Sequence, residues 1–299
     1  MKWKGRRQSS NVEDRRGQSG SGQGIGGFNP TLLRPLFKIL FSKVGLFLVG
    51  IFLVISLIMG KNPLTLISQF LNGGNLQTES SVPYKSTAKE EELADFSKTI
   101  LADTEDIWNK LLDNYREPTL VLFTGSVSSA CGSASSSTGP FYCPGDEKLY
   151  LDLSFFDDME RQLNAPGDFA QAYVIAHEVG HHIQKITGIT DKIQRLRGQV
   201  SQTEYNKYSV RLELQADFLA GVWAHYSQQM TSMMESGDLE EALNAANAIG
   251  DDRLQKQSSG RVVPDSFTHG TSAQRMRWFK KGFDTGDLSQ GDTFSASSL

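Results

Sequence analysis

Three of the five histidines in this 299-residue chain lie in one short stretch, "AHEVGHHIQK", residues 176–185. On an α-helix His177 and His181 are four residues apart, so their side chains lie one above the other on the same face. His182 is rotated by about 100° from His181 and leaves that face. Two imidazoles on one helix face are typical of a metal site. Because a catalytic zinc ion needs three protein ligands and one open position, another element must supply the third ligand.

A second amphipathic helix offers that ligand. Ser201 and Glu204 predict a capping box at the start of a helix that extends to about Ser227. Glu213 and Asp217 stand four residues apart on a face beside its apolar stripe. One carboxylate can bind a metal ion, and the other can accept the remaining N–H of a ligating histidine and so fix its tautomer. This geometry predicts a site shared by two helices.

An uncharged run, "VGLFLVGIFLVISLIMG", occupies residues 44–60. Crossing a bilayer takes about 20 apolar residues, and the run reaches that length when "ILFS" before Lys43 is included. The alternative is a buried core helix, although such helices are rarely apolar all round over this length. The sequence therefore predicts one transmembrane helix at residues 37–60. The Lys and Arg before it predict a cytoplasmic amino terminus and an extracytoplasmic domain.

Charge is divided unevenly along the chain. Residues 1–43 carry nine Lys or Arg against two acids, whereas the whole chain has a net charge of −4, so the remainder sums to −11. An acidic bulk argues against a nucleic-acid partner. Composition predicts a disordered basic cytoplasmic tail at 1–36, a linker at 61–87 and a disordered tail at 286–299.

Residues 88–285 have the composition and patterning of one globular domain. Apolar residues recur at the helical period from Lys89 to Tyr115, and "TLVLF" reads as a strand. "FYC" and "KLYLDLSFF" flank the turn signal at 144–147 and predict a hairpin. Residues 150–155 are either a substrate-binding edge strand or simply a sheet edge. Asp168 is a candidate N-cap and Gly188 a candidate stop for the histidine helix.

H-E-x-x-H followed by E-x-x-x-D resembles the gluzincin arrangement of thermolysin-like and integral-membrane zinc proteases. The phrases "AYVIAHEVGHHIQ", "LELQADFLAGVWA", "HGTSAQR" and "YCPGDEKLYLDLSFF" resemble the bacterial putative neutral zinc metallopeptidase family. The likeness covers most of residues 87–285 together with the single span. It implies an α+β, zincin-like domain with a small antiparallel sheet, several helices and one Zn²⁺ per chain. The residue roles that it implies are metal ligands His177, His181 and Glu213, the general base Glu178, and Asp217 behind the ligands.

Two further residues are candidates for the site. His269 lies in "SFTHGTSAQR", just before a helix that Thr271 and Gln274 could cap. By the same resemblance it would stabilise a developing oxyanion; the alternative is a surface-loop histidine. Arg275 is either a structural ion-pair partner or a substrate clamp. His182 is interpreted as a hydrogen-bonded histidine that does not bind metal.

The chain has only two cysteines, Cys131 and Cys143, and both follow the predicted span. Twelve residues apart, they predict a disulfide that stabilises the domain by about 3 kcal/mol through loop entropy. No partner motif supports them as zinc ligands.

The sequence as a whole predicts a membrane-anchored, zinc-dependent metallopeptidase whose partners are the membrane and a protein or peptide substrate. A different class remains open: a catalytically silent, zinc-stabilised interaction module in the cell envelope. A structural site would close the fourth zinc position, usually with Cys or His, and no such residue is evident. Hydrolysis of a non-peptide bond in the envelope is a third possibility. The presence of Glu178 favours the peptidase over the interaction module. The sequence does not indicate the oligomeric state.

Overall fold

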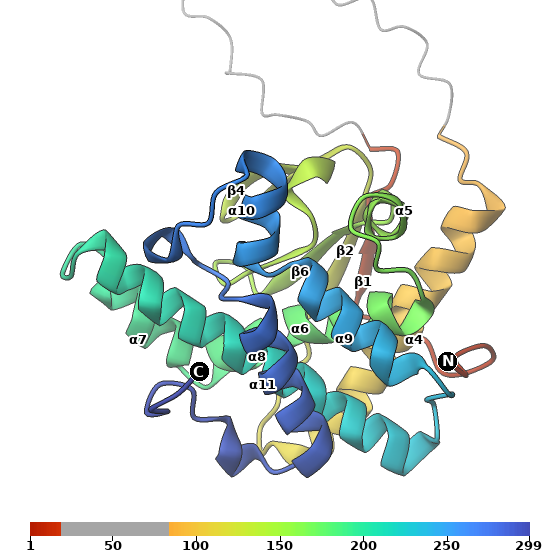
Figure 1. Cartoon of the computed structure of the whole chain (residues 1–299). Helices are drawn as coiled ribbons and strands as arrows, with labels where there is room; N and C mark the ends of the chain where they lie inside the picture. The colour runs from red at the N-terminus through yellow and green to blue at the C-terminus, as the bar shows by residue number, and fades with distance from the viewer. Residues whose placement is uncertain (19–83) are drawn as a thin grey trace, which may run out of the picture. The chain divides into compact units, whose positions relative to one another are not determined.

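A four-stranded sheet with helices packed on one face organises the described part of the chain, residues 1–18 and 84–299 of a computed structural model (Figure 1). The α+β class predicted from the sequence is confirmed. The elements in chain order are β1 (Val12–Asp14), α4 (Ala88–Leu111), β2 (Thr119–Phe123), β3 (Ser126–Ser129), β4 (Gly132–Ser135), η1 (Ser136–Thr138), β5 (Phe141–Cys143), β6 (Lys148–Asp152), α5 (Ser154–Arg161), α6 (Asp168–Ile186), α7 (Ile189–Leu196), α8 (Gln202–Thr231), α9 (Asp238–Ala248), α10 (Asp251–Ser259), η2 (Pro264–Ser266), α11 (Ser272–Thr285) and η3 (Leu288–Gly291).

The strand order in the main sheet is β1-β2-β6-β5. The predicted hairpin is confirmed, because β5 pairs antiparallel with β6. The sheet is nevertheless mixed, not antiparallel, since β1, β2 and β6 run parallel. The chain between β2 and β6 folds into a separate two-stranded sheet, β3-β4, before it returns. The expected edge strand at 150–155 is wrong: β6 lies between β2 and β5 and ends at Asp152, so β5 is the edge.

Alternation along β2 and β6 sends their side chains to two different cores. One set, Leu120, Leu122, Leu149 and Leu151, packs against the helices. Val121, Phe123 and Tyr150 pack with Val127 and Cys143 under the β3-β4 hairpin. Both faces of β6 are therefore covered, including the one that carries Tyr150 and Asp152.

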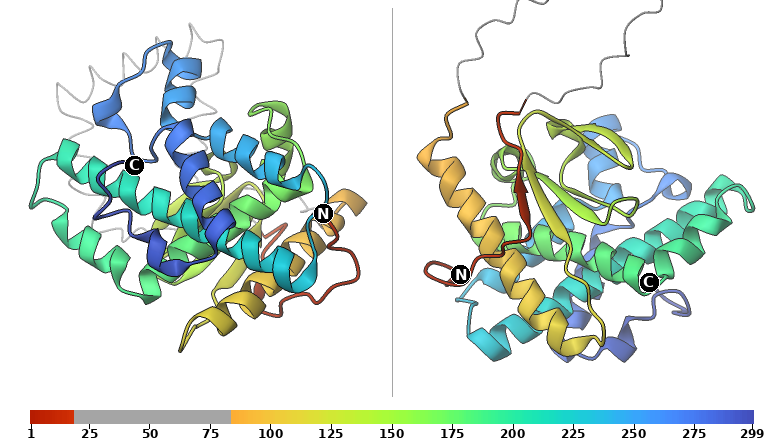
Figure 2. Two further views of the ribbon diagram at one scale, coloured as in Figure 1. Left: turned by 60° about the horizontal axis from the view of Figure 1, so that its bottom comes forward. Right: turned by 180° about the vertical axis from the view of Figure 1, so that it is seen from behind.

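Residues 1–18 belong to the domain, which corrects the prediction of a disordered tail at 1–36. β1 pairs in parallel with β2, Val12 opposite Leu120. The segment also runs beside α4 (Figure 2, right). Arg7 Nη2 donates to Glu105 Oε2 at 2.9 Å and to the carbonyl of Ala102 at 2.7 Å. Composition alone suggested that the charged side chains of this segment are solvated. In the fold they form ion pairs with opposite charges on α4 and β6. Residues 19–36 lie outside the described residues.

The carboxyl end is also packed, so the predicted disordered tail at 286–299 is wrong as well. Thr293 is fully buried, and its hydroxyl donates to the carbonyl of Arg211 at 2.6 Å. The amide of Gln215 donates to the carbonyl of Gly291 at 2.9 Å. The segment covers one side of α8, and the domain extends beyond the predicted limits of 88–285 at both ends.

The predicted transmembrane helix at 37–60 lies outside the described residues, as does the linker up to residue 83. Within residues 1–18 and 84–299, no helix combines the length and the apolar character that a membrane crossing needs.

Helices α6, α8 and α11 approach one another closely, and two glycines permit this. A Cβ on Gly180 would lie 3.0 Å from the carbonyl oxygen of Ala216 on α8. A Cβ on Gly282 of α11 would lie 2.1 Å from the carbonyl oxygen of Phe218 on α8. The N-cap of α6 is Gly167 instead of the predicted Asp168, and Gly188 follows its end with a φ of 77°. The close contacts bring the polar faces of the three helices together.

Candidate metal centre

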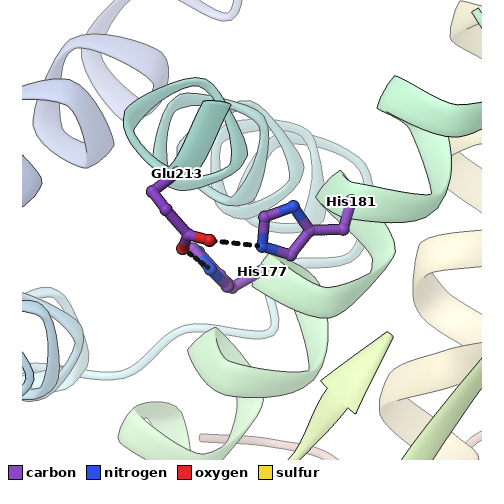
Figure 3. A group of neighbouring side chains, drawn as sticks. All are labelled: His177, His181 and Glu213. Carbon is purple, nitrogen blue, oxygen red and sulfur yellow. Dashed lines mark hydrogen bonds and ion pairs between the residues drawn. The ribbon is translucent and has the colours of Figure 1, made fainter. Parts of the chain in front are cut away.

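His177 and His181 on α6 face Glu213 on α8 across the contact that Gly180 allows (Figure 3). His177 Nε2 lies 3.2 Å from Glu213 Oε2, and His181 Nε2 lies 3.5 Å from Glu213 Oε1. Tetrahedral zinc with bonds of 2.0–2.2 Å separates its ligand atoms by about 3.4 Å. The three side chains therefore fit one zinc ion, and the structure brings together the ligands that the sequence predicted.

In each imidazole Nδ1, the ring nitrogen that faces away from Glu213, has its own hydrogen-bond acceptor. His177 Nδ1 lies 2.8 Å from Asp217 Oδ1, and His181 Nδ1 lies 2.9 Å from Gln184 Oε1. Since carboxylate and amide oxygens accept, Nδ1 of each ring donates. Each Nε2 therefore faces the group formed by His177, His181 and Glu213 (the triad) and can bind a metal ion once it carries no proton. Asp217 was predicted from the sequence, but Gln184 was not. The sequence feature that could have indicated Gln184 is its position three residues after His181 on the same helix.

Asp217 is held by a buried group of polar side chains. Arg275 Nε and Nη2 donate to its two carboxylate oxygens at 2.8 and 2.9 Å, and the hydroxyl of Tyr173 donates at 2.5 Å. Burial alone would raise the pKa of Asp217, but Arg275 and His177 outweigh it and hold the pKa at about 2. Both ends of the Asp217–Arg275 pair are 2% exposed or less. Arg275 is thus a structural ion-pair partner, the first of its two predicted roles.

Without a bound cation, the side chains of the triad shift one another's pKa values strongly. Burial would lower the pKa of His177, but Asp217 and Glu213 raise it to about 9. The pKa of Glu213 is well below its usual value: burial opposes ionisation, but the two imidazoles stabilise the carboxylate. A cation that binds here must displace the proton on His177, which couples metal affinity to pH.

Glu178 lies beside the triad without belonging to it. It lines a cavity of about 670 Å³ together with His177, His181 and Glu213. Burial raises its pKa, while the imidazoles of His181 and His177 and the backbone N–H of Tyr142 oppose that rise. A carboxylate with a raised pKa next to a metal group is suited to accept a proton. Its placement agrees with the predicted role.

His269 lines the same cavity, with about half of its side chain exposed. Its Nδ1 lies 3.3 Å from Asp251 Oδ1, and the backbone N–H groups of residues 268–270 donate to Asp251 Oδ2. Asp251 thereby orients both the loop and the ring. Asp251 could not be identified from the sequence, because its partners lie 17 to 19 residues further along the chain.

The remaining candidates lie away from the triad. His182 is fully buried, and burial lowers its pKa. As predicted, it does not join the metal group. Cys131 and Cys143 form the predicted disulfide, with their Cα atoms 5.8 Å apart. The disulfide joins the β3-β4 turn to the edge strand β5.

The fold and the site define a class of protein: an α+β domain in which H-E-x-x-H on one helix and E-x-x-x-D on a second bring together three side chains that could hold one metal ion. The family model described as "Putative neutral zinc metallopeptidase" matches residues 1–294. The chain belongs to this family. The match begins at the first residue, so it includes the segment that pairs with β2.

Two relatives illustrate the extent of the similarity. Uncharacterized protein YpfJ of Escherichia coli (strain K12) is 51% identical over 301 residues, which cover 99% of this chain and all of that protein. Uncharacterized protein Rv2575 of Mycobacterium tuberculosis is 44% identical over 204 residues, which cover 64% of this chain and 68% of that protein. No solved structure shows a significant match.

Proposed function

We propose that this protein is a zinc-dependent peptidase that cleaves peptide bonds with a metal-activated water. The observation that carries the proposal is the donor set. In the described chain the group contains His177, His181 and Glu213 and no fourth His, Cys, Asp or Glu. Three protein ligands leave one position open, which is typical of catalytic zinc, whereas structural sites are closed by a fourth ligand.

Each residue of the site has a task in this reaction. When bound, zinc would polarise a water molecule and bring its pKa to about 7. Glu178 takes the proton of the attacking water and then delivers it to the departing amine. His269, oriented by Asp251, lies on the cavity wall where its Nε2 can donate to the developing oxyanion. Asp217 and Gln184 hold the two imidazoles in the required tautomers.

The edge strand β5 favours an extended polypeptide as the substrate. β5 pairs only with β6 in the described part of the chain, and Phe141 and Tyr142 line the cavity. A peptide can add to such an edge through backbone hydrogen bonds. Arg275 donates to Asp217 through Nε and Nη2 and to the carbonyl of Ile249 through Nη1, and its side chain is 2% exposed, so it is not available to bind a substrate carboxylate. The site therefore suits internal segments of a chain better than a free carboxyl terminus.

For localisation, we propose that the domain lies outside the cytoplasm and is attached to the membrane through residues 37–60. The uncharged run and the disulfide support this, since disulfides persist in oxidising compartments. A single crossing between residues 18 and 84 would separate β1 from β2, which are paired. We therefore propose that residues 1–18 lie on the same side of the membrane as residues 84–299.

A chelator experiment on the full-length protein tests the peptidase. Several peptide libraries are incubated with purified protein, with and without 1,10-phenanthroline, and the products are identified by mass spectrometry. Cleavage that is lost with chelator and restored by zinc is expected, and Glu213→Ala is expected to be inactive. Zinc-loaded protein that cuts no library would contradict the proposal and favour the interaction module. Cleavage of only non-peptide envelope substrates would favour the third reading.

A further inference from the structure

His182 connects the metal-binding helix to two other elements. Its ring is fully buried directly after the ligand His181. Nε2 lies 2.5 Å from the carbonyl oxygen of Arg116, and Nδ1 lies 3.1 Å from the hydroxyl oxygen of Tyr142. A carbonyl oxygen can only accept, so Nε2 carries the proton. Nδ1 then accepts from the hydroxyl of Tyr142, and both polar atoms of the ring are satisfied.

Tyr142 is the central residue of the edge strand β5, and each β5 residue is fixed by a different contact. The ring of Phe141 stacks on Tyr150 with centroids 4.8 Å apart, and Cys143 forms the disulfide. Both contacts hold β5 to the rest of the β structure. The Tyr142 side chain instead reaches α6, where its ring also packs edge-on against His182 at 5.5 Å.

Tyr142 also lies beside the reacting groups. It lines the same cavity as Glu178, which is one turn before His182 on α6, and its backbone N–H is one of the groups that oppose the rise in the pKa of Glu178. Tyr142 thus links β5 to α6 at His182 and borders the site at Glu178. The part-buried His182–Tyr142 hydrogen bond therefore links β5 directly to the helix that carries the predicted metal ligands.

We propose that His182 and Tyr142 are positioning residues that set β5 against α6, so that the β5 edge lies beside Glu178 in the cavity and meets the substrate. The proposal rests on the peptidase function proposed above. It gives a reason for the second histidine of "HH" that does not involve metal. Neither residue is expected to affect zinc binding.

Two tyrosine variants test the pair. Tyr142→Phe removes one hydroxyl and keeps the ring. Tyr115→Phe is the matched control, because Tyr115 also packs edge-on against His182, at 5.9 Å, while its hydroxyl has no hydrogen-bond partner among the described residues. We expect Tyr142→Phe to lower kcat about tenfold with KM changed less than about threefold, because a misplaced catalytic group loses rate more than binding. Zinc content should match wild type in both variants.

Amide hydrogen exchange supplies a readout that needs no activity. In zinc-loaded full-length protein, the amides of residues 141–150 should exchange about tenfold faster in Tyr142→Phe than in Tyr115→Phe. The pair should also be coupled: adding Tyr142→Phe to His182→Leu should cost little further kcat, because the bond is already lost.

The outcomes separate this inference from the peptidase function. Wild-type exchange at 141–150 in Tyr142→Phe, or equal losses in Tyr115→Phe, would overturn the positioning role whether or not peptides are cut. Multiplicative losses in the double variant would overturn it as well. A wild-type protein without any cleavage would overturn the peptidase, and the exchange result would still decide whether the pair holds β5.

Discussion

Asp217 Oδ1 lies 2.8 Å from His177 Nδ1, and the same carboxylate accepts two hydrogen bonds from Arg275. This one side chain joins α8, α6 and α11. Because Nδ1 of His177 is bound to Asp217, Nε2 of His177 faces Glu213. Asp217 does not belong to the group of three side chains that could hold a metal ion. The tautomer of His177 and the packing of α11 therefore depend on the same carboxylate.

Replacing this carboxylate should weaken zinc binding. Asp217→Asn keeps the volume of the side chain but removes the charge, so zinc affinity should fall by about 10- to 100-fold, the usual effect of losing such a partner. A competition titration with a zinc indicator measures the affinity. Glu160→Gln, an exposed change on α5, is the control. Unchanged affinity in Asp217→Asn would mean that another group fixes His177.

Acid should destabilise the metal-free protein through the same pair. The pKa of Asp217 is about 2 in the folded state, below an unfolded value of about 4. Its contribution to the free energy of unfolding is therefore complete above about pH 4 and is lost as the pH falls through about 2, a change of about 3 kcal/mol. Urea unfolding across this range should show a steeper fall in wild type than in Asp217→Asn. Parallel curves would show that the Asp217 carboxylate does not carry this pH dependence.

Gln184 should matter for His181 as Asp217 does for His177. Gln184→Leu removes the acceptor of His181 Nδ1, and we expect zinc affinity to fall about tenfold. Gln194→Leu, a change of the same type at a residue that lines the cavity without bonding His181, should leave affinity unchanged. Equal affinities for the two variants would remove Gln184 from the site.

The two histidines and the two carboxylates could be identified from the sequence by helical spacing, because His177 lies one turn from His181 and Glu213 one turn from Asp217. That Glu213 and not Asp217 faces the histidines was implied by the family resemblance. Gly180, by allowing α6 to approach α8, completes the arrangement. Asp251 and the β1-β2 pairing could not be predicted, since both depend on contacts between residues distant in sequence. The charged residues of 1–18 were misread because composition does not show which charges find partners in the fold.

Whether residues 1–18 and residues 84–299 lie on the same side of the membrane can be measured directly. Ser10→Cys and Ser236→Cys place exposed thiols on the amino-terminal segment and on the α8–α9 connection. A membrane-impermeant thiol reagent added to intact cells should label both, and detergent-lysed cells show the maximum for each. Labelling of position 236 without position 10 would restore the single crossing with a cytoplasmic amino terminus.

The central claim, that Glu178 is the base of a zinc peptidase, is tested most directly by the cleavage rate of Glu178→Gln. Glutamine keeps the volume and the hydrogen-bonding reach but cannot accept the proton of the attacking water, so kcat should fall by about 10²- to 10⁴-fold. Zinc content and thermal stability should match wild type, because Glu178 is not one of the three ligands. Wild-type cleavage by Glu178→Gln that 1,10-phenanthroline still abolishes would contradict the account, because zinc would then act with a different base.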